Sequence, residues 1–145
     1  LIGLALLADT SAVRDIPKLW NSRIRSEVTA GLWAPPDEIT EWSHVRVLCR
    51  GKDAVMLHRA GDTEVLFPEF GKPQALYLDR GAERPADVER KLRQVSTASV
   101  VVLSKVGGMT APNYDFLAEW PEFRAPLAKF ELILDGKFFK VYRRR

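Results

Sequence analysis

The C-terminal sixteen residues, from Phe130 to Arg145, constrain the fold more than any other part of the chain. Two apolar, aromatic-rich runs flank Asp135-Gly136. This dipeptide is typical of a two-residue type I′ turn, because Gly adopts a positive φ freely and Asp tolerates one. The sequence therefore predicts an antiparallel β-hairpin at the end of the chain.

A two-residue turn also fixes the register of that hairpin. The predicted pairs are Leu134 with Lys137, Leu132 with Phe139, Phe130 with Val141, Ile133 with Phe138, Glu131 with Lys140, and Lys129 with Tyr142. Cross-strand pairs contribute about 0.2–1 kcal/mol each, which is too little for an isolated hairpin. We therefore expect a larger sheet, with helices covering the face formed by Phe130, Leu132, Phe139 and Val141.

Length and composition are those of a globular domain. A chain of 145 residues with 46% apolar and 28% charged residues predicts one soluble domain, residues 1–145. The net charge is +3, and the basic residues are interspersed with acidic ones, so we expect no nucleic-acid partner. Arg143-Arg144-Arg145 form either a solvated tail or a contact with anionic lipid headgroups.

The chain opens with the apolar run Leu1 to Ala8. Eight residues cannot cross a bilayer, which needs about 20, and no basic region precedes them as in a signal peptide. Two interpretations stay open: a buried strand or first helical turns, and the trailing end of a transmembrane helix.

Helical periodicity follows. Asp9 to Gly31 carries apolar residues at spacings of three and four, interrupted by Pro17. A second helix begins at Pro36 and stops at Gly51. Its inner face contains Ile39, Trp42, Val45 and Cys49. The single cysteine excludes an internal disulfide, and we interpret it as an inert core thiol.

From residue 54 the pattern changes to short apolar runs. Strands are predicted over 54–58, 74–79 and 99–105, whereas 64–67 fits either a strand or a helical turn. Pro85 to Ser96 is the clearest helix, with an apolar stripe of Val88, Leu92 and Val95. Strand 74–79, this helix and the strand containing Val100-Val-Val-Leu103 make a βαβ unit.

A short helix around Tyr114 to Trp120, with Phe116 and Leu117 facing inward, then leads past Pro121 to the hairpin. The predicted fold is a small layered α/β sandwich. Its mixed sheet is parallel at the centre and antiparallel where the hairpin joins.

Sequence motifs for catalysis are missing. No Walker loop, dinucleotide-binding Gly-rich loop or nucleophile elbow occurs. His44, His58 and Cys49 lack the spacing of metal ligands. No residue is therefore predicted to be catalytic, and no metal or other cofactor is expected in this domain.

Candidate ligand-binding residues follow from position alone, because ligands of open α/β sheets bind beyond the carboxyl ends of the strands. These candidates are His58, Asp79, Arg80, Ser104, Lys105, Gly107 and Gly108. The loop after Leu103 offers backbone N–H groups to an anion, with Lys105 adding positive charge. In the alternative interpretation, Gly81 and Gly108 are turn residues, Asp79 and Arg80 form a solvated pair, and His58 lies at the surface.

The order of segments resembles the extracytoplasmic C-terminal domain of polytopic glycosyltransferases that use dolichyl- or polyprenyl-phosphate sugars, the mannosyltransferase type. The resemblance is carried by the apolar leader, Gly51-Lys-Asp-Ala-Val-Met-Leu-His58, Leu66-Phe-Pro-Glu-Phe-Gly-Lys-Pro73, Ala98-Ser-Val-Val-Val-Leu103 with the following Pro112 and Tyr114, and the ending from Phe130 to Arg144. The ending, which is close to the pattern Phe-Glu-(apolar)-Asp-Gly-x-x-Val-Tyr-Arg-Arg, is its most specific part.

The resemblance implies a parent enzyme at the extracytoplasmic face of a membrane that transfers sugar from a lipid-phosphate donor. Its catalytic carboxylate, and any divalent cation, would lie in the membrane part, which this chain does not contain. Residues 1–145 would help to shape the acceptor side without transferring sugar themselves. The implied partners are the transmembrane part of the same protein, lipid headgroups, and a lipid-linked sugar or acceptor.

Two other functions stay open. One is a soluble domain that binds a nucleotide or phosphometabolite through Lys105 to Gly108 and Asp79-Arg80. The other is a protein-interaction module in which an exposed Trp33 or Trp120 docks a partner.

Overall fold

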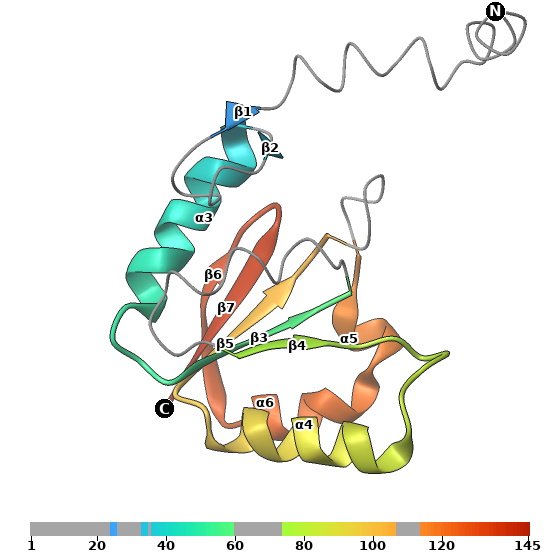
Figure 1. Ribbon diagram of the computed structural model, residues 1–145. Coiled ribbons are helices and arrows are strands. Elements are labelled where there is room, and N and C mark those ends of the chain that lie inside the picture. The colour runs from blue at the N-terminus through green and yellow to red at the C-terminus, as the bar shows by residue number, and fades with distance from the viewer. Residues whose placement is uncertain (1–23, 26–32, 35, 60–73, 107–113) are drawn as a thin grey trace, which may run out of the picture.

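The computed structural model describes residues 24–25, 33–34, 36–59, 74–106 and 114–145. Its main body is a five-stranded mixed sheet with strand order β4-β3-β5-β7-β6, covered by helices on both faces (Figure 1). The predicted class, a small layered α/β fold with a parallel centre and a C-terminal antiparallel hairpin, is confirmed.

Three parallel strands form one half of the sheet: β3 (Ala54–His58), β4 (Gln74–Tyr77) and β5 (Val100–Ser104), with β3 between the other two. Every residue of β3 and β5 is buried. This is expected of apolar runs that are covered on both faces. Strand β4 ends two residues earlier than predicted, and 64–67 lies outside the described residues.

Helix α4 (Pro85–Thr97) connects β4 to β5, which confirms the predicted βαβ unit, with β3 lying between its two strands. Val95 is buried against the sheet, and Val88 and Leu92 pack beside it. The Lys91 ammonium lies under the helix, where it donates to the Tyr77 carbonyl at 2.6 Å and to Glu83 Oε1 at 2.5 Å. This contact ties α4 to the end of β4.

Helix α3 (Pro36–Cys49) covers the opposite face of the sheet. Trp42, Val45 and Cys49 are buried as predicted, and the Trp42 and Phe139 rings lie 4.9 Å apart. Gly51 follows the helix with φ of 68°, a left-handed conformation that glycine adopts without strain. Burial raises the pKa of the Cys49 thiol to about 11, so the thiol stays protonated and unreactive at neutral pH.

The face that carries α4 also carries three short helical segments: α5 (Phe116–Glu119), η4 (Pro121–Phe123) and α6 (Arg124–Leu127). Phe116, Trp120 and Phe123 form an aromatic cluster here, with the Phe116 and Phe123 rings 5.5 Å apart. Phe116 points inward as predicted, and Leu117 packs against the same core.

One prediction for the N-terminal region is wrong. Ile24–Arg25 form a short strand, β1, that pairs antiparallel with Trp33–Ala34, β2, where a helix from Asp9 to Gly31 was predicted. The helix was predicted from the spacing of apolar residues within 9–31 alone. The strand that pairs with Ile24–Arg25 lies after Gly31, so this spacing carries no information about it. The rest of that predicted helix and the apolar leader lie outside the described residues. In the part of the chain that the structure describes, no helix is long and apolar enough to cross a membrane.

The C-terminal hairpin forms, but in a different register from the predicted one. Its strands are β6 (Phe130–Asp135) and β7 (Phe139–Arg144), joined by the three residues 136–138. The observed pairs are Phe130 with Arg144, Glu131 with Arg143, Leu132 with Tyr142, Leu134 with Val141 and Asp135 with Lys140, with an irregularity between Leu132 and Leu134.

This register separates residues that were predicted to share a face. Phe130 packs in the core under α4, whereas Phe139 and Val141 pack under α3, and Leu132 is 44% exposed. A shift by an odd number of positions exchanges the faces of a strand. Gly136 does not adopt a positive φ, so the predicted type I′ turn does not form.

The carboxylate of Glu41 on α3 explains the longer loop. Its Oε2 accepts from the Lys137 N–H at 2.9 Å, and its Oε1 accepts from the N–H groups of Phe138 and Phe139 at 3.0 and 2.7 Å. Three successive N–H groups converging on one anion form an anion-binding nest. Asp37, one turn earlier, pairs with the Lys137 ammonium at 2.6 Å, so α3 holds the hairpin tip at two points.

Candidate functional site

The carboxyl ends of β3, β4 and β5 lie at the same end of the sheet because these strands are parallel. The fold therefore brings five of the seven candidate residues, His58, Asp79, Arg80, Ser104 and Lys105, to one end of the molecule. Gly107 and Gly108 lie outside the described residues. Each of the five has a defined environment, and most of their polar groups contact the protein itself.

His58 is fully buried at the end of β3. Its ring lies 5.7 Å from the ring of Tyr77, its neighbour on β4. The sequence placed His58 either in a binding site or at the surface, and the surface placement is wrong. A side chain with no exposed area does not meet a solvent-borne ligand in this conformation.

Asp79 shapes the turn after β4. Its Oδ1 accepts from the Gly81 N–H at 2.9 Å, and its carbonyl accepts from the N–H groups of Ala82 and Glu83. An Asp side chain that bonds its own backbone two residues later is a common turn device. The alternative role of Gly81 as a turn residue agrees with this geometry, but Asp79 does not pair with Arg80.

Arg80 instead reaches across to the α5–η4 connection. Its two terminal nitrogens donate to the Glu122 carboxylate at 2.8 and 2.9 Å, and its Nε donates to the Glu119 carbonyl at 2.9 Å. The guanidinium lies 3.8 Å above the Trp120 ring. Hydrogen bonding to Arg80 lowers the pKa of Glu122 below its usual value, because it favours the carboxylate.

The Arg80 contact also corrects the prediction for Trp120. In the alternative of a protein-interaction module, an exposed Trp33 or Trp120 docks the partner, yet Trp120 is fully buried beneath Arg80 and among Phe116 and Phe123. Its position at the end of a short helix gave no sign of this, because the covering residue lies 40 positions earlier in the sequence. The side chain of Trp33 lies outside the described part.

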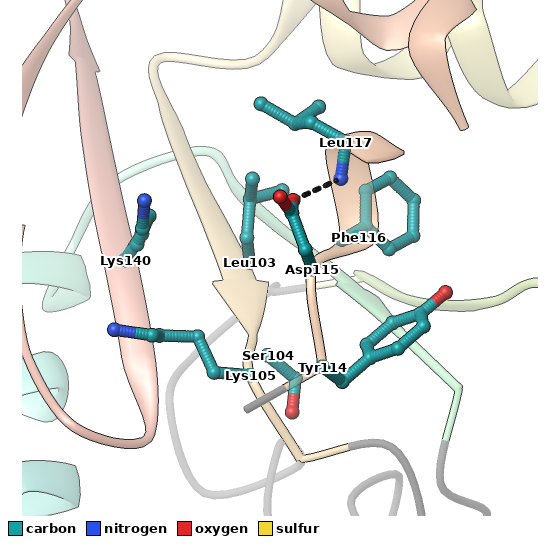
Figure 2. Close-up of a pocket in the computed structure, with 8 residues that line it drawn as sticks. All are labelled: Leu103, Ser104, Lys105, Tyr114, Asp115, Phe116, Leu117 and Lys140. Atoms are coloured by element: carbon teal, nitrogen blue, oxygen red, sulfur yellow. Dashed lines mark hydrogen bonds between the residues drawn. The ribbon is translucent and has the colours of Figure 1, made fainter. Parts of the chain in front are cut away.

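Ser104 ends β5, Lys105 follows it, and the two polar groups have different partners. The Ser104 hydroxyl is buried and accepts from the Val106 N–H at 3.2 Å; in Figure 2 it points away from Asp115. The Lys105 ammonium donates to the Gly136 carbonyl at 2.5 Å and lies 3.3 Å from Asp135 Oδ1. Lys105 thus holds the hairpin tip in addition to Glu41 and Asp37.

A cavity of about 180 Å³ opens beside Lys105. Its lining residues are Leu103, Ser104, Lys105, Tyr114, Asp115, Phe116, Leu117 and Lys140 (Figure 2). Lys105 and Lys140 supply two positive charges, and both approach Asp135, at 3.3 and 3.6 Å. The Asp115 carboxylate accepts from the N–H groups of Leu117 and Ala118, which balances part of its charge.

Tyr114 lines this cavity, Tyr142 lies on β7, and both phenols stay protonated at neutral pH. Burial, together with the neighbouring Glu119 carboxylate, raises the pKa of Tyr114, and Arg59 lies 5.7 Å above its ring. Burial followed by Asp135 and Asp115 raises the pKa of Tyr142. Both phenols are hydrogen-bond donors and not bases in this environment.

Sequence reasoning missed Asp115 and Lys140 as cavity residues. Asp115 directly precedes the apolar run of α5 and is a preferred N-cap type, so it was a recognisable helix start. Lys140 was assigned to Glu131 by the wrong hairpin register, whereas it lies beside Leu103 of β5. The correct hairpin register pairs Lys140 with Asp135, and the separate pairing of β7 with β5 brings it close to Lys105.

Metal binding has no support at this end of the sheet. Within the described ranges, no three His, Cys, Asp or Glu side chains gather in a way that could hold a metal ion.

Comparisons of this chain with protein-family models, with curated proteins and with solved structures find no match.

Proposed function

We propose that this chain is a non-catalytic domain of a membrane glycosyltransferase that takes its sugar from a lipid-phosphate donor. It would stand at the extracytoplasmic face, pack on the transmembrane part of the same protein and help to shape the acceptor side. The sequence basis is the order of segments that ends in Phe130 to Arg144.

The proposal that this domain is non-catalytic is supported by one observation: the charged side chains at the carboxyl end of the sheet bond to other groups of the protein. Arg80 bonds Glu122 and the Glu119 carbonyl, and Lys105 bonds Asp135 and the Gly136 carbonyl. Catalytic acids and bases need free access to the reacting group and a pKa suited to proton transfer. These residues hold the fold together instead, as expected of a domain that positions other parts.

The test begins with the reading frame that encodes Leu1. Several apolar segments of about 20 residues ahead of Leu1 are expected, and a frame that starts near Leu1 without them would overturn the proposal. Membranes that contain the full-length protein should then transfer sugar from a polyprenyl-phosphate donor. Residues 1–145 alone should show no transfer above background, and clear transfer by this domain would contradict the non-catalytic role.

The cavity favours a second candidate, a domain that binds a small phosphorylated metabolite. Two lysines beside a cavity of about 180 Å³ suit a phosphate group. The volume lies below the roughly 300–1,000 Å³ of typical ligand pockets, so a whole nucleotide would not fit.

Thermal-shift measurements with sugar phosphates and with nucleotides separate the candidates. If the second candidate is right, sugar phosphates raise Tm in a saturable way, and Lys105→Ala and Lys140→Ala both remove this ligand-dependent rise. Because Lys105 also supports the hairpin tip, the rise is compared with each variant's own Tm without ligand. No rise with any sugar phosphate would exclude this candidate.

A further inference from the structure

One end of the sheet gathers segments from distant parts of the chain. The Arg144 N–H donates to the Ser99 carbonyl at 2.9 Å, and the Ser99 N–H donates to the Asp53 carbonyl at 2.8 Å. At the edge, the Arg145 N–H donates to the Lys129 carbonyl at 3.3 Å. The starts of β3, β5 and β6 therefore meet the end of β7, and the last turn of α3 leads into the same region.

Basic residues dominate this end of the molecule, which we call the basic end. Its charged members are the basic residues Arg46, Arg50, Lys52, Lys129, Arg143, Arg144 and Arg145 and the acidic residues Asp53 and Glu131. Seven positive charges against two negative give a net +5, although the whole chain carries only +3. The rest of the chain is therefore net negative, by two charges.

Internal contacts neutralise only part of this charge. Arg143 pairs with Glu131 at 3.1 Å, and Arg144 donates to the carbonyls of Ala98 and Ser96. The last arginines thus belong to the end of β7 and do not form a free tail. The remaining exposed cations, which make no ion pair with any described residue, are Arg50, Lys52, Lys129 and Arg145.

We propose that the basic end docks on the surface of an anionic lipid bilayer. The distance from β3 across β5 and β7 to β6 is three strand spacings, about 14 Å in total. This is comparable with the screening length of about 8–10 Å at physiological salt, so the basic residues attract an anionic surface together. Basic residues near such a surface each add to binding.

The apolar surface beside these charges suits a bilayer better than a nucleic acid. Val47 is 65% exposed and lies on the same side of α3 as Arg50, three residues later, where it can enter the headgroup region. Single-stranded nucleic acids are bound by stacking on exposed aromatic rings. The exposed aromatic residue of the described part, Tyr77, pairs with His58 at the opposite end of the sheet.

Sedimentation with vesicles tests this inference on residues 1–145. The probes are vesicles of phosphatidylcholine with one quarter phosphatidylglycerol and vesicles of phosphatidylcholine alone, at 0.1 M and 0.5 M NaCl. We expect binding to the anionic vesicles only, with most of it lost at 0.5 M NaCl. The double variant R50E/K52E should bind at least tenfold more weakly, because two attractions become repulsions.

The matched control is R84E/R90E, which changes the net charge equally. Arg84 directly precedes α4 and Arg90 lies on it, both outside the basic end, so this variant should bind as the unchanged protein does. Circular dichroism confirms that both variants are folded. Three outcomes would each overturn the inference. They are equal binding to both vesicle types, an equal loss of vesicle binding in both variants, and tighter binding to a DNA duplex than to anionic vesicles. No lipid-linked sugar enters the experiment, so its outcome does not depend on the proposed function.

Discussion

At the hairpin tip and at the α5–η4 connection, a charged side chain from a distant part of the sequence binds several groups, but in opposite ways. The Glu41 carboxylate accepts from three backbone N–H groups of the tip. The Arg80 guanidinium donates to a backbone carbonyl and to the Glu122 carboxylate. Glu41 is half-buried where α3 meets the start of β7, whereas 44% of the Arg80 side chain is exposed.

The two contacts therefore have different roles. The N–H groups that Glu41 binds belong to a loop whose length sets the pairing of β6 with β7, so Glu41 selects one register among several. Arg80 binds helical segments whose aromatic side chains are already packed around Trp120. Losing Glu41 should therefore reduce the stability of the fold far more than losing Arg80.

The largest effect is expected for Glu41→Ala. It leaves three N–H groups without their acceptor, which should lower the free energy of unfolding by about 3 kcal/mol in urea titration. His44→Ala, at an exposed position of the same helix, is the control and should change it by less than about 0.5 kcal/mol. If the two variants are equally stable, Glu41 does not hold the hairpin.

Gly136→Ala should come next. A Cβ at this position would lie 2.0 Å from Glu41 Oε1, so the carboxylate must leave the loop, at a cost of about 2 kcal/mol. The control is Gly81→Ala, where the Cβ would meet Asp79 Oδ1 at an ordinary 3.4 Å. In a Glu41→Ala background the cost of Gly136→Ala should largely disappear; additive costs would show that the two residues act independently.

Arg80→Ala should lower Tm less than either of these variants, because its side chain lies at the surface. It should instead uncover Trp120, which would appear as stronger quenching of tryptophan fluorescence by acrylamide. The added quenching should vanish when Trp120→Phe is combined with Arg80→Ala. Arg84→Ala, which loses only a surface pair with Asp87, should leave quenching unchanged.

The smallest expected effect is the loss of stability at acidic pH. Hydrogen bonds from Lys137 and Arg80 lower the pKa of Asp37 and Glu122 below their ordinary values of 3.8 and 4.5. The stability that these carboxylates add is therefore present above those values and lost as the pH falls through the lower folded values. Tm measured between pH 6 and pH 2 should fall less steeply for Arg80→Ala; an equal slope would show that Glu122 adds nothing.

The sequence predicted the parallel half of the sheet well because local patterns determine it. Pro85 and the stripe ending in Val95 define α4, and the apolar run from Val100 fits a strand that is buried on both faces. The hairpin is different, because Asp135-Gly136 favours a tight turn and only Glu41, far away in the sequence, makes the longer loop favourable. No rule based on neighbouring residues detects such a contact.

The candidate site shows the same limit. Strand ends were located to within two residues, so Lys105 was found, but its cavity neighbour Lys140 depends on how β7 pairs with β5. His58 is buried at the end of β3, an interior strand, and the partner of Arg80 depends on how the helical connection packs. The position of a residue along a strand predicts at which end of the sheet it lies. Its contact partners come from segments far away in the sequence, so local patterns do not predict them.

The place of β7 has a consequence for how this protein is made. The strand formed by the last residues of the chain lies inside the sheet, between β5 and β6, and its tip is held by a helix residue 96 to 98 positions earlier. During synthesis, α3 emerges from the ribosome long before the backbone groups that Glu41 binds. The sheet can therefore close only after β7 has emerged from the ribosome, and a chain without β7 would leave β5 as an unpaired edge that is exposed to aggregation.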